Sequence, residues 1–296
     1  MRWRRAAGWT AGVLAVILAA GGIFVWLSLN GSLTRKYTPE ALIALLAPHI
    51  VVVKPEGDGP FPAVLMYSGC EGLWDGAQRR PLMGIYADIA VSEGVVAIIV
   101  DSLKPRGIDS SQAYRLVCPG LAVRGAARAG DVAVTIAWAR ALPFVNPEKI
   151  ALAGWSHGGW AIMDMLAMRP DSETPQSLTA WPDDTFAGLR GMFLVYPYCG
   201  FPALAPWRGF AEPLPAWAIH GTDDATADPA PCDRAYGHLV AAGVPVAVEV
   251  VEGATHAFDR PDVLPGSSSK YDPAFAAIAH DQFRRFLREV LLAPWQ

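Results

Sequence analysis

The chain has 296 residues, of which 24 are lysine or arginine and 28 are aspartate or glutamate, so its formal net charge is −4. A charge this close to zero gives no reason to expect nucleic acid or another polyanion as a partner. Hydrophobic residues make up 52% of the chain and charged residues 18%, which excludes intrinsic disorder and leaves ample apolar material for a large core.

The N-terminal segment is the most apolar part of the chain. Residues 6–34 carry no charged side chain, and about 20 apolar residues are enough to cross a bilayer as a helix. Arg2, Arg4 and Arg5 precede this stretch, which favours an N-terminus that stays in the cytoplasm.

We therefore expect residues 1–35 to form a transmembrane helix that anchors the protein by a single pass. Residues 36–296 would then form one domain in the periplasm or outside the cell. The alternative is a cleaved signal peptide followed by secretion, although residues 26–31 lack the small-x-small pattern of a cleavage site.

Four cysteines, Cys70, Cys118, Cys199 and Cys232, fit an oxidising compartment. They allow three pairings, and the sequence does not choose among these or exclude four free thiols. No two of them have the CxxC spacing of a zinc or thioredoxin-type site, so we predict neither a metal nor a cofactor.

From about residue 50, short apolar runs alternate with amphipathic stretches. The runs that read as strands are 50–53, 63–67, 95–100, 150–153, 191–196, 216–219 and 246–251. The stretches that read as helices include 82–92, 122–142, 158–168, 234–242 and 273–292. Continuous apolar runs are typical of strands buried on both faces. The pattern predicts an α/β domain with a mostly parallel sheet and helices on both faces.

A candidate nucleophile follows the fourth of these strands. Gly154-Trp155-Ser156-His157-Gly158 is a G-x-S-x-G sequence between a predicted strand and a predicted helix, which is the setting of a nucleophile elbow. The tight turn exposes the serine hydroxyl above the sheet, and it requires small residues two positions to either side.

A serine hydroxyl needs a base and a carboxylate that orients the base, and in this fold the acid precedes the histidine. Asp224 follows the 216–219 strand in a G-x-x-D loop and is the predicted acid, with Asp223 and Asp228 as rivals. His256 follows the 246–251 strand and has the right order and placement to be the base.

Acyl transfer also requires two backbone N–H donors for the oxyanion. We expect His157, the residue after the nucleophile, to supply one of them through its main chain. The loop after the 63–67 strand reads Ser-Gly-Cys-Glu-Gly, and we expect the main-chain N–H of Cys70 to supply the other.

These motifs together resemble the dienelactone hydrolase family of α/β-hydrolases over roughly residues 50–292. The matching blocks are 67–72, 101–107, 154–158, 196–200, 221–232 and 253–259. The resemblance implies an α/β-hydrolase fold and a triad of Ser156, Asp224 and His256. Founding members of the family use cysteine as the nucleophile, so a serine here favours a more general hydrolase of carboxylic esters or lactones.

The resemblance also implies arginines that hold a substrate carboxylate. Arg260, four residues after His256, matches one such position, and Arg106 lies in about the right loop for the other. An arginine can donate two parallel hydrogen bonds to a carboxylate. This gives the hypothesis of a preference for anionic esters, with ordinary ion pairing of both arginines as the alternative.

The sequence thus predicts a serine hydrolase that forms an acyl-enzyme from a small-molecule ester or lactone. An acyltransferase or peptidase on the same triad is the alternative enzyme, and a noncatalytic binding module that retains the fold is the alternative outside catalysis. The natural substrate and the oligomeric state stay open.

Overall fold

The structure is a computed structural model that describes residues 2–263 and 267–293, with side chains in the N-terminal helix described from residue 15 onward. The strands are β1 (Val51–Val53), β2 (Phe61–Tyr67), β3 (Trp74–Asp75), β4 (Gln78–Arg79), β5 (Val96–Val100), β6 (Val145–Trp155), β7 (Leu189–Val195), β8 (Ala216–Gly221) and β9 (Val246–Val251).

The longer helices are α1 (Arg2–Leu29), α2 (Pro39–Leu46), α3 (Leu82–Ser92), α5 (Gly125–Arg140), α6 (His157–Ala167), α8 (Ala230–Ala241) and α9 (Pro273–Phe286). The short helical segments are η1 (Ala47–His49), η2 (Lys104–Arg106), α4 (Ser110–Gln112), η3 (Ala113–Val117), α7 (Ala205–Arg208) and η4 (Leu287–Leu292).

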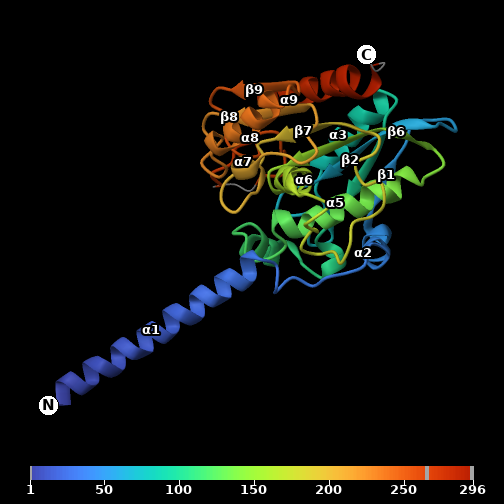
Figure 1. The fold of residues 1–296 in the computed structure, drawn as a ribbon. Helices are drawn as coiled ribbons and strands as arrows, with labels where there is room; N and C mark the ends of the chain where they lie inside the picture. Colours follow the sequence, from blue (N-terminus) through green and yellow to red (C-terminus); the bar gives the residue numbers. More distant parts are fainter. Residues whose placement is uncertain (1, 264–266, 294–296) are drawn as a thin grey trace.

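In the described part of the chain, seven strands form one sheet in the order β1-β5-β2-β6-β7-β8-β9 (Figure 1). Only β1 runs antiparallel to its neighbour in this sheet, and the other adjacent strands pair in parallel. Since parallel strands end at one edge, the loops that follow β2, β6, β8 and β9 meet there. The predicted parallel α/β architecture is confirmed.

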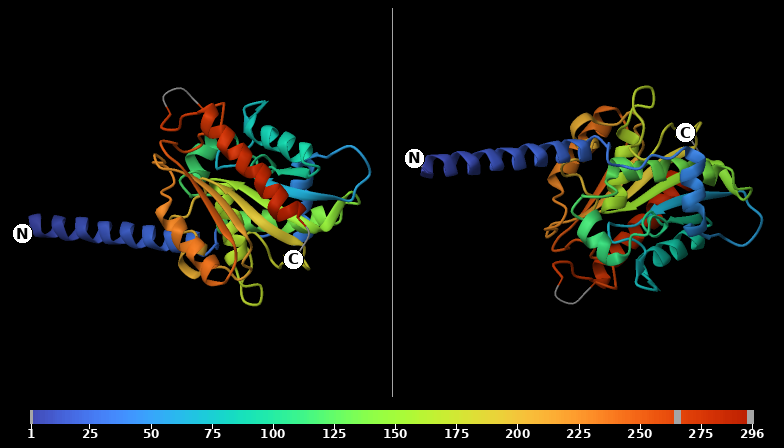
Figure 2. Two further views of the ribbon diagram at one scale, coloured as in Figure 1. Left: turned by 90° about the horizontal axis from the view of Figure 1, so that it is seen from above. Right: turned by 90° about the horizontal axis from the view of Figure 1, so that it is seen from below.

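Helices cover both faces of this sheet (Figure 2). Leu65 of β2 belongs to the apolar core beneath α2, α5, α6 and α8. Its neighbours Val64 and Met66 point to the other face, where α3 and α9 pack. Each central strand therefore buries side chains on both faces, which explains its continuous apolar run.

The expectation of burial on both faces is wrong for β9. Val248 and Val250 are 43% and 59% exposed, because β9 is the last strand of the sheet and only part of it is covered. β1, at the opposite edge, likewise leaves Val52 36% exposed.

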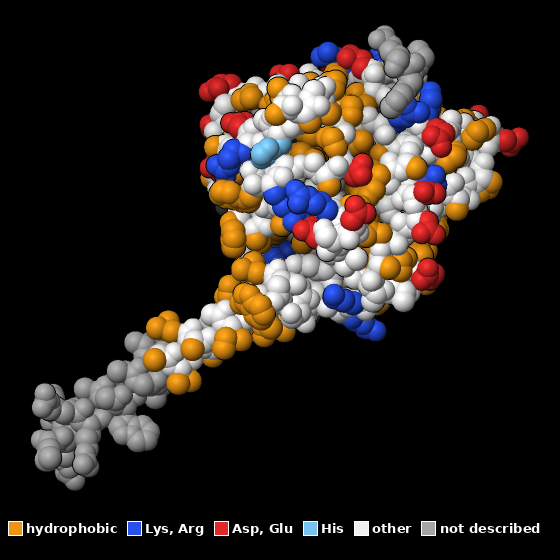
Figure 3. Space-filling model, viewed as in Figure 1, with side chains coloured by type: hydrophobic (Ala, Val, Ile, Leu, Met, Phe, Trp, Pro, Cys, Tyr) orange, Lys and Arg blue, Asp and Glu red, His pale blue; other side chains and the backbone are white. Residues whose placement is uncertain are grey.

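The N-terminal segment forms one helix, α1, that projects away from the body (Figures 1 and 2). Hydrophobic side chains are exposed along its described part (Figure 3). Of the helices that the structure describes, none meets the combined length and apolarity needed to cross a membrane.

All four cysteines are paired, and the structure selects one of the three pairings that the sequence leaves open. Cys70 is bonded to Cys118, and Cys199 is bonded to Cys232. The first disulfide joins the loop after β2 to the segment after η3, and the second joins the loop after β7 to α8.

Candidate active site

Ser156 lies at the sharp turn between β6 and α6. Its backbone has φ +50° and ψ −112°, a conformation that non-glycine residues rarely adopt. A Cβ on Gly154 would stand 2.5 Å from the backbone nitrogen of Gly159, and one on Gly158 would overlap the carbonyl oxygen of Tyr67. Only glycine at these positions lets α6 approach β6 and the end of β2 so closely, and the sequence pattern predicted small residues here.

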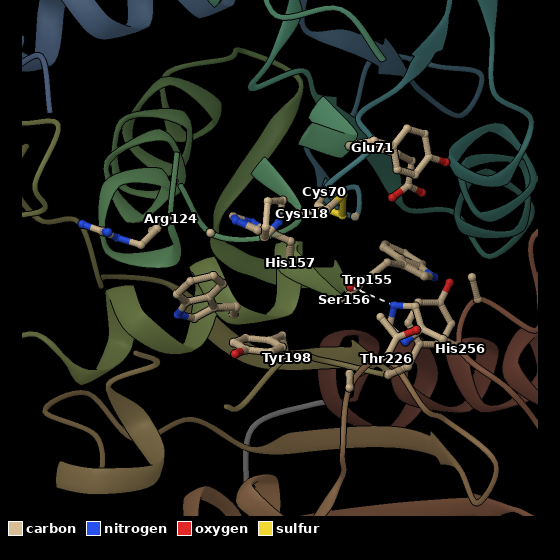
Figure 4. A pocket seen from close by; sticks show the side chains of 18 of the residues that line it. Cys70, Glu71, Cys118, Arg124, Trp155, Ser156, His157, Tyr198, Thr226 and His256 are labelled. Atoms are coloured by element: carbon tan, nitrogen blue, oxygen red, sulfur yellow. Dashed lines mark hydrogen bonds between the residues drawn. A yellow bond between two sulfur atoms is a disulfide. The ribbon is translucent and has the colours of Figure 1, made fainter. Parts of the chain in front are cut away.

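The structure brings the three predicted triad residues into contact, although they come from distant parts of the chain (Figure 4). His256 Nε2 lies 3.0 Å from Ser156 Oγ, and His256 Nδ1 lies 2.7 Å from Asp224 Oδ2. A carboxylate beside Nδ1 favours the tautomer protonated there, which leaves Nε2 free to accept the serine proton.

Asp224 is held firmly in this position. Its side chain is 2% exposed, and its other oxygen, Oδ1, accepts hydrogen bonds of 2.8 Å from the backbone N–H groups of Thr226 and Ala227. The rival acids lie elsewhere: Asp223 is exposed and accepts from Thr222, and Asp228 accepts from a backbone N–H at the start of α8.

A buried network supports the histidine ring, and sequence reasoning missed it. The Tyr196 ring packs 4.7 Å from the His256 ring, and its hydroxyl donates to Asp259 Oδ1 at 2.6 Å. Tyr86 and Trp155 donate to Asp259 Oδ2 at 2.7 and 3.3 Å. Burial raises the pKa of the Asp259 carboxyl, against the effect of these donors. Asp259 stands in a block that resembles the family, but nothing in the sequence marks it as buried.

Both predicted oxyanion donors line the same cavity as Ser156. His157 is the first residue of α6, so its backbone N–H has no acceptor within the helix. Cys70 is tied to Cys118, which also lines the cavity. Burial and the neighbouring Arg128 guanidinium lower the pKa of the His157 imidazole to about 3, so this side chain stays neutral.

The two predicted carboxylate-binding arginines are placed differently. Arg260 lines the cavity, but it donates to Glu71 Oε1 at 2.8 Å and lies 3.5 Å from Asp262. Arg106 lies outside the Ser156 cavity, where it makes two hydrogen bonds of 2.7 and 3.0 Å to Asp131. The Asp131 side chain is fully buried and requires a counter-charge, so the structure does not bring Arg106 to the site.

The cavity beside Ser156 has a volume of about 600 Å³. Within residues 2–263 and 267–293, no cluster of three or more histidine, cysteine, aspartate or glutamate side chains is arranged to hold a metal ion.

A parallel sheet covered on both faces, with a serine elbow facing a histidine and an aspartate, defines an α/β-hydrolase fold. Solved structures share it. A putative dienelactone hydrolase from Klebsiella pneumoniae has a TM-score of 0.59 and 18% identity, over 81% of this chain and 90% of its own. A thermophilic esterase from Thermogutta terrifontis with bound propionate has a TM-score of 0.57 and 20% identity, over 83% and 91%. The same esterase phosphorylated by paraoxon has a TM-score of 0.59.

At this level of identity the similarity shows the fold, and the predicted resemblance to dienelactone hydrolases is confirmed as a resemblance of fold. No protein-family model matches the chain, and no curated protein matches it either.

Proposed function

We propose that the protein is a serine hydrolase of carboxylic esters. The observation that carries this proposal is the unbroken hydrogen-bonded series from Ser156 Oγ through both nitrogens of His256 to Asp224. The fold shared with an esterase and a putative dienelactone hydrolase supports it.

In the proposed reaction, Ser156 Oγ attacks the ester carbonyl carbon while its proton passes to His256 Nε2. The backbone N–H groups of Cys70 and His157 stabilise the oxyanion of the tetrahedral intermediate. Collapse of the intermediate breaks the bond to the alcohol, which leaves with the proton from His256. Water then repeats the sequence on the acyl-enzyme and releases the acid.

The experiment is covalent labelling of the full chain by paraoxon, which phosphorylates the esterase of the same fold. We expect the intact mass to rise by one diethyl phosphoryl group on Ser156, and hydrolysis of p-nitrophenyl esters to stop. Ser156→Ala should take up no label. Folded protein that is neither labelled nor active would favour a noncatalytic binding module. Preferential transfer of the acyl group to an added alcohol or amine would favour an acyltransferase.

We also propose that the domain works outside the cytoplasm. Two disulfides support this location, because such bonds persist in oxidising compartments. The membrane anchor at residues 1–35 stays a prediction. Protease added to spheroplasts of the producing cells tests the location of the domain. Carbonate extraction of the membrane fraction tests the anchor. Protein that is protected from protease in spheroplasts and recovered with the cytoplasm would contradict the location.

A further inference from the structure

The cavity that contains Ser156 is not built by the hydrolase domain alone. The last two turns of α1 contribute Phe24, Val25, Ser28 and Leu29 to its wall. Phe24 and Val25 are 59% and 53% exposed, so the domain leaves much of their apolar surface uncovered.

Specific polar contacts hold this end of α1 against the domain. Arg124 donates to the Ser28 hydroxyl at 2.8 Å, and the side-chain amide of Gln176 donates to the backbone carbonyl of Leu29 at 2.7 Å. Arg124 is only 8% exposed. Gly31, at φ +79°, then turns the chain where a Cβ would run into Gln176. Two side-chain hydrogen bonds therefore attach the wall to the domain.

Aromatic and aliphatic side chains form much of the lining of the cavity, alongside polar ones. In Figure 4, Ser156 and His256 lie on one side of the view, Arg124 lies on the other, and His157 and Tyr198 stand between them. Further large apolar side chains line the cavity, namely Trp160, Leu121 and Phe201. Leu121 and Phe201 are themselves 62% and 68% exposed.

Two of the charged side chains that line the cavity pair with each other, and a third, Arg124, donates to α1. Arg260 and Glu71 neutralise each other near the serine. The Arg124 guanidinium contacts Ser28 at the far side. A cavity of about 600 Å³ is of the size that holds drug-sized ligands, far larger than the acyl group of an acetate ester.

We propose that the preferred substrates are esters with an apolar chain of about eight carbons or more, and that the chain binds against Phe24 and Val25 of α1. This proposal rests on the proposed ester hydrolysis and names its substrate class. Each buried CH₂ group strengthens binding by roughly fourfold when fully desolvated. We therefore expect kcat/KM for p-nitrophenyl octanoate to exceed that for the acetate by at least about tenfold.

The test compares two double variants of the full chain. Phe24→Ala with Val25→Ala removes the apolar wall, whereas Val16→Ala with Ile17→Ala alters exposed positions about two turns earlier on the same helix. We expect the wall variant to lower kcat/KM for the octanoate about tenfold and to leave the acetate within twofold. The control variant should change neither. Equal effects on both esters, or none on the octanoate, would overturn the proposal.

A binding measurement separates this proposal from the proposed function. In a Ser156→Ala background, the Kd of p-nitrophenyl octanoate can be measured by calorimetry. The wall variant should raise this Kd about tenfold, and the control variant should leave it unchanged. An unchanged Kd refutes the role of α1 even if esters are hydrolysed. Failure of the wild-type chain to hydrolyse any ester, with the Kd effect intact, contradicts only the proposed hydrolysis.

Discussion

The guanidinium of Arg260 donates to the Glu71 carboxylate over 2.8 Å inside the cavity that contains Ser156. Both side chains are largely buried, with exposed fractions of 9% and 14%. The sequence suggested that Arg260 binds a carboxylate of the substrate. In the structure, the Glu71 carboxylate already neutralises the charge of Arg260. A preference for anionic esters would require the substrate to displace Glu71.

This ion pair predicts how charge selectivity responds to mutation. We expect the double variant Arg260→Ala with Glu71→Ala, which removes both charges, to change kcat/KM by the same factor for p-nitrophenyl hemisuccinate and for the neutral butyrate. Glu71→Gln leaves Arg260 without its main partner, so the hemisuccinate should gain about tenfold relative to the butyrate, as a charge-assisted hydrogen bond would provide. Glu56→Gln, on an exposed loop, is the control. A selective loss of activity on the hemisuccinate in this double variant would restore the hypothesis of carboxylate binding.

The proposed role of Asp224 as the acid of the triad can be tested by comparing it with its sequence neighbour Asp223. Asp224→Asn places an amide where Nδ1 of His256 requires an acceptor, which favours the wrong tautomer. We expect kcat to fall about 10³- to 10⁴-fold with little change in the unfolding midpoint. Asp223→Asn alters an exposed carboxylate that does not contact His256, and it should stay within a few-fold of wild type. Similar losses in the two variants would mean that Asp224 is not the orienting acid.

The two disulfides form a matched pair for testing the oxyanion donors. They close loops of similar size, with sequence separations of 48 and 33, so each should stabilise the fold by about 4 kcal/mol. Only Cys70–Cys118 lines the cavity and holds the backbone N–H proposed to bind the oxyanion. Replacing this pair by serines should lower kcat about 10- to 100-fold with a smaller change in KM.

The control replaces Cys199 and Cys232 by serines. This variant should lose similar stability and keep kcat within a few-fold of wild type, when both are assayed well below their unfolding temperatures. If the two variants lose activity in proportion to their stability, the first disulfide has no separate positioning role.

A buried acid on α6 makes stability depend on pH. Asp164 is fully buried, and its Oδ1 accepts from the backbone N–H of Leu204 at 2.7 Å. Burial raises its pKa to about 8, whereas an unfolded aspartate titrates near 3.9. The folded state therefore binds a proton that the unfolded state has released between these pH values, so this group's contribution to stability falls as the pH rises from about 4 to 8.

The variant that isolates this effect is Asp164→Asn, which keeps an acceptor for the Leu204 N–H but cannot ionise. Relative to the variant, the wild type should lose on the order of a few kcal/mol of unfolding free energy between pH 5 and pH 8. Urea unfolding at both pH values measures this difference. Asp171→Asn alters an exposed position, so its unfolding free energy should depend on pH in the same way as that of the wild type. Wild-type and Asp164→Asn stabilities that change in parallel with pH would show that Asp164 is not protonated in the fold.

Much of the fold could be predicted because its signals are local. The apolar runs of β2, β5, β6, β7 and β8 are continuous because both sheet faces are covered, and the glycines around Ser156 are required by one sharp turn. Placement after consecutive parallel strands was enough to select His256, because such strands end at a common edge.

Contacts between distant segments could not be predicted in this way. Arg260 has the spacing of a substrate-binding residue, yet its partner Glu71 lies 189 positions away in the chain. The cysteine pairing, the burial of Asp259 and the approach of α1 to the cavity likewise depend on segments that meet only after packing.

The sequence by itself determined the order of strands and helices, the serine elbow and the candidate acid and base, since each follows from residues a few positions apart. Only the tertiary structure decided which charges are already neutralised and which helix completes the cavity. Ion pairing and burial depend on distances in space, and neighbours along the chain do not specify those distances.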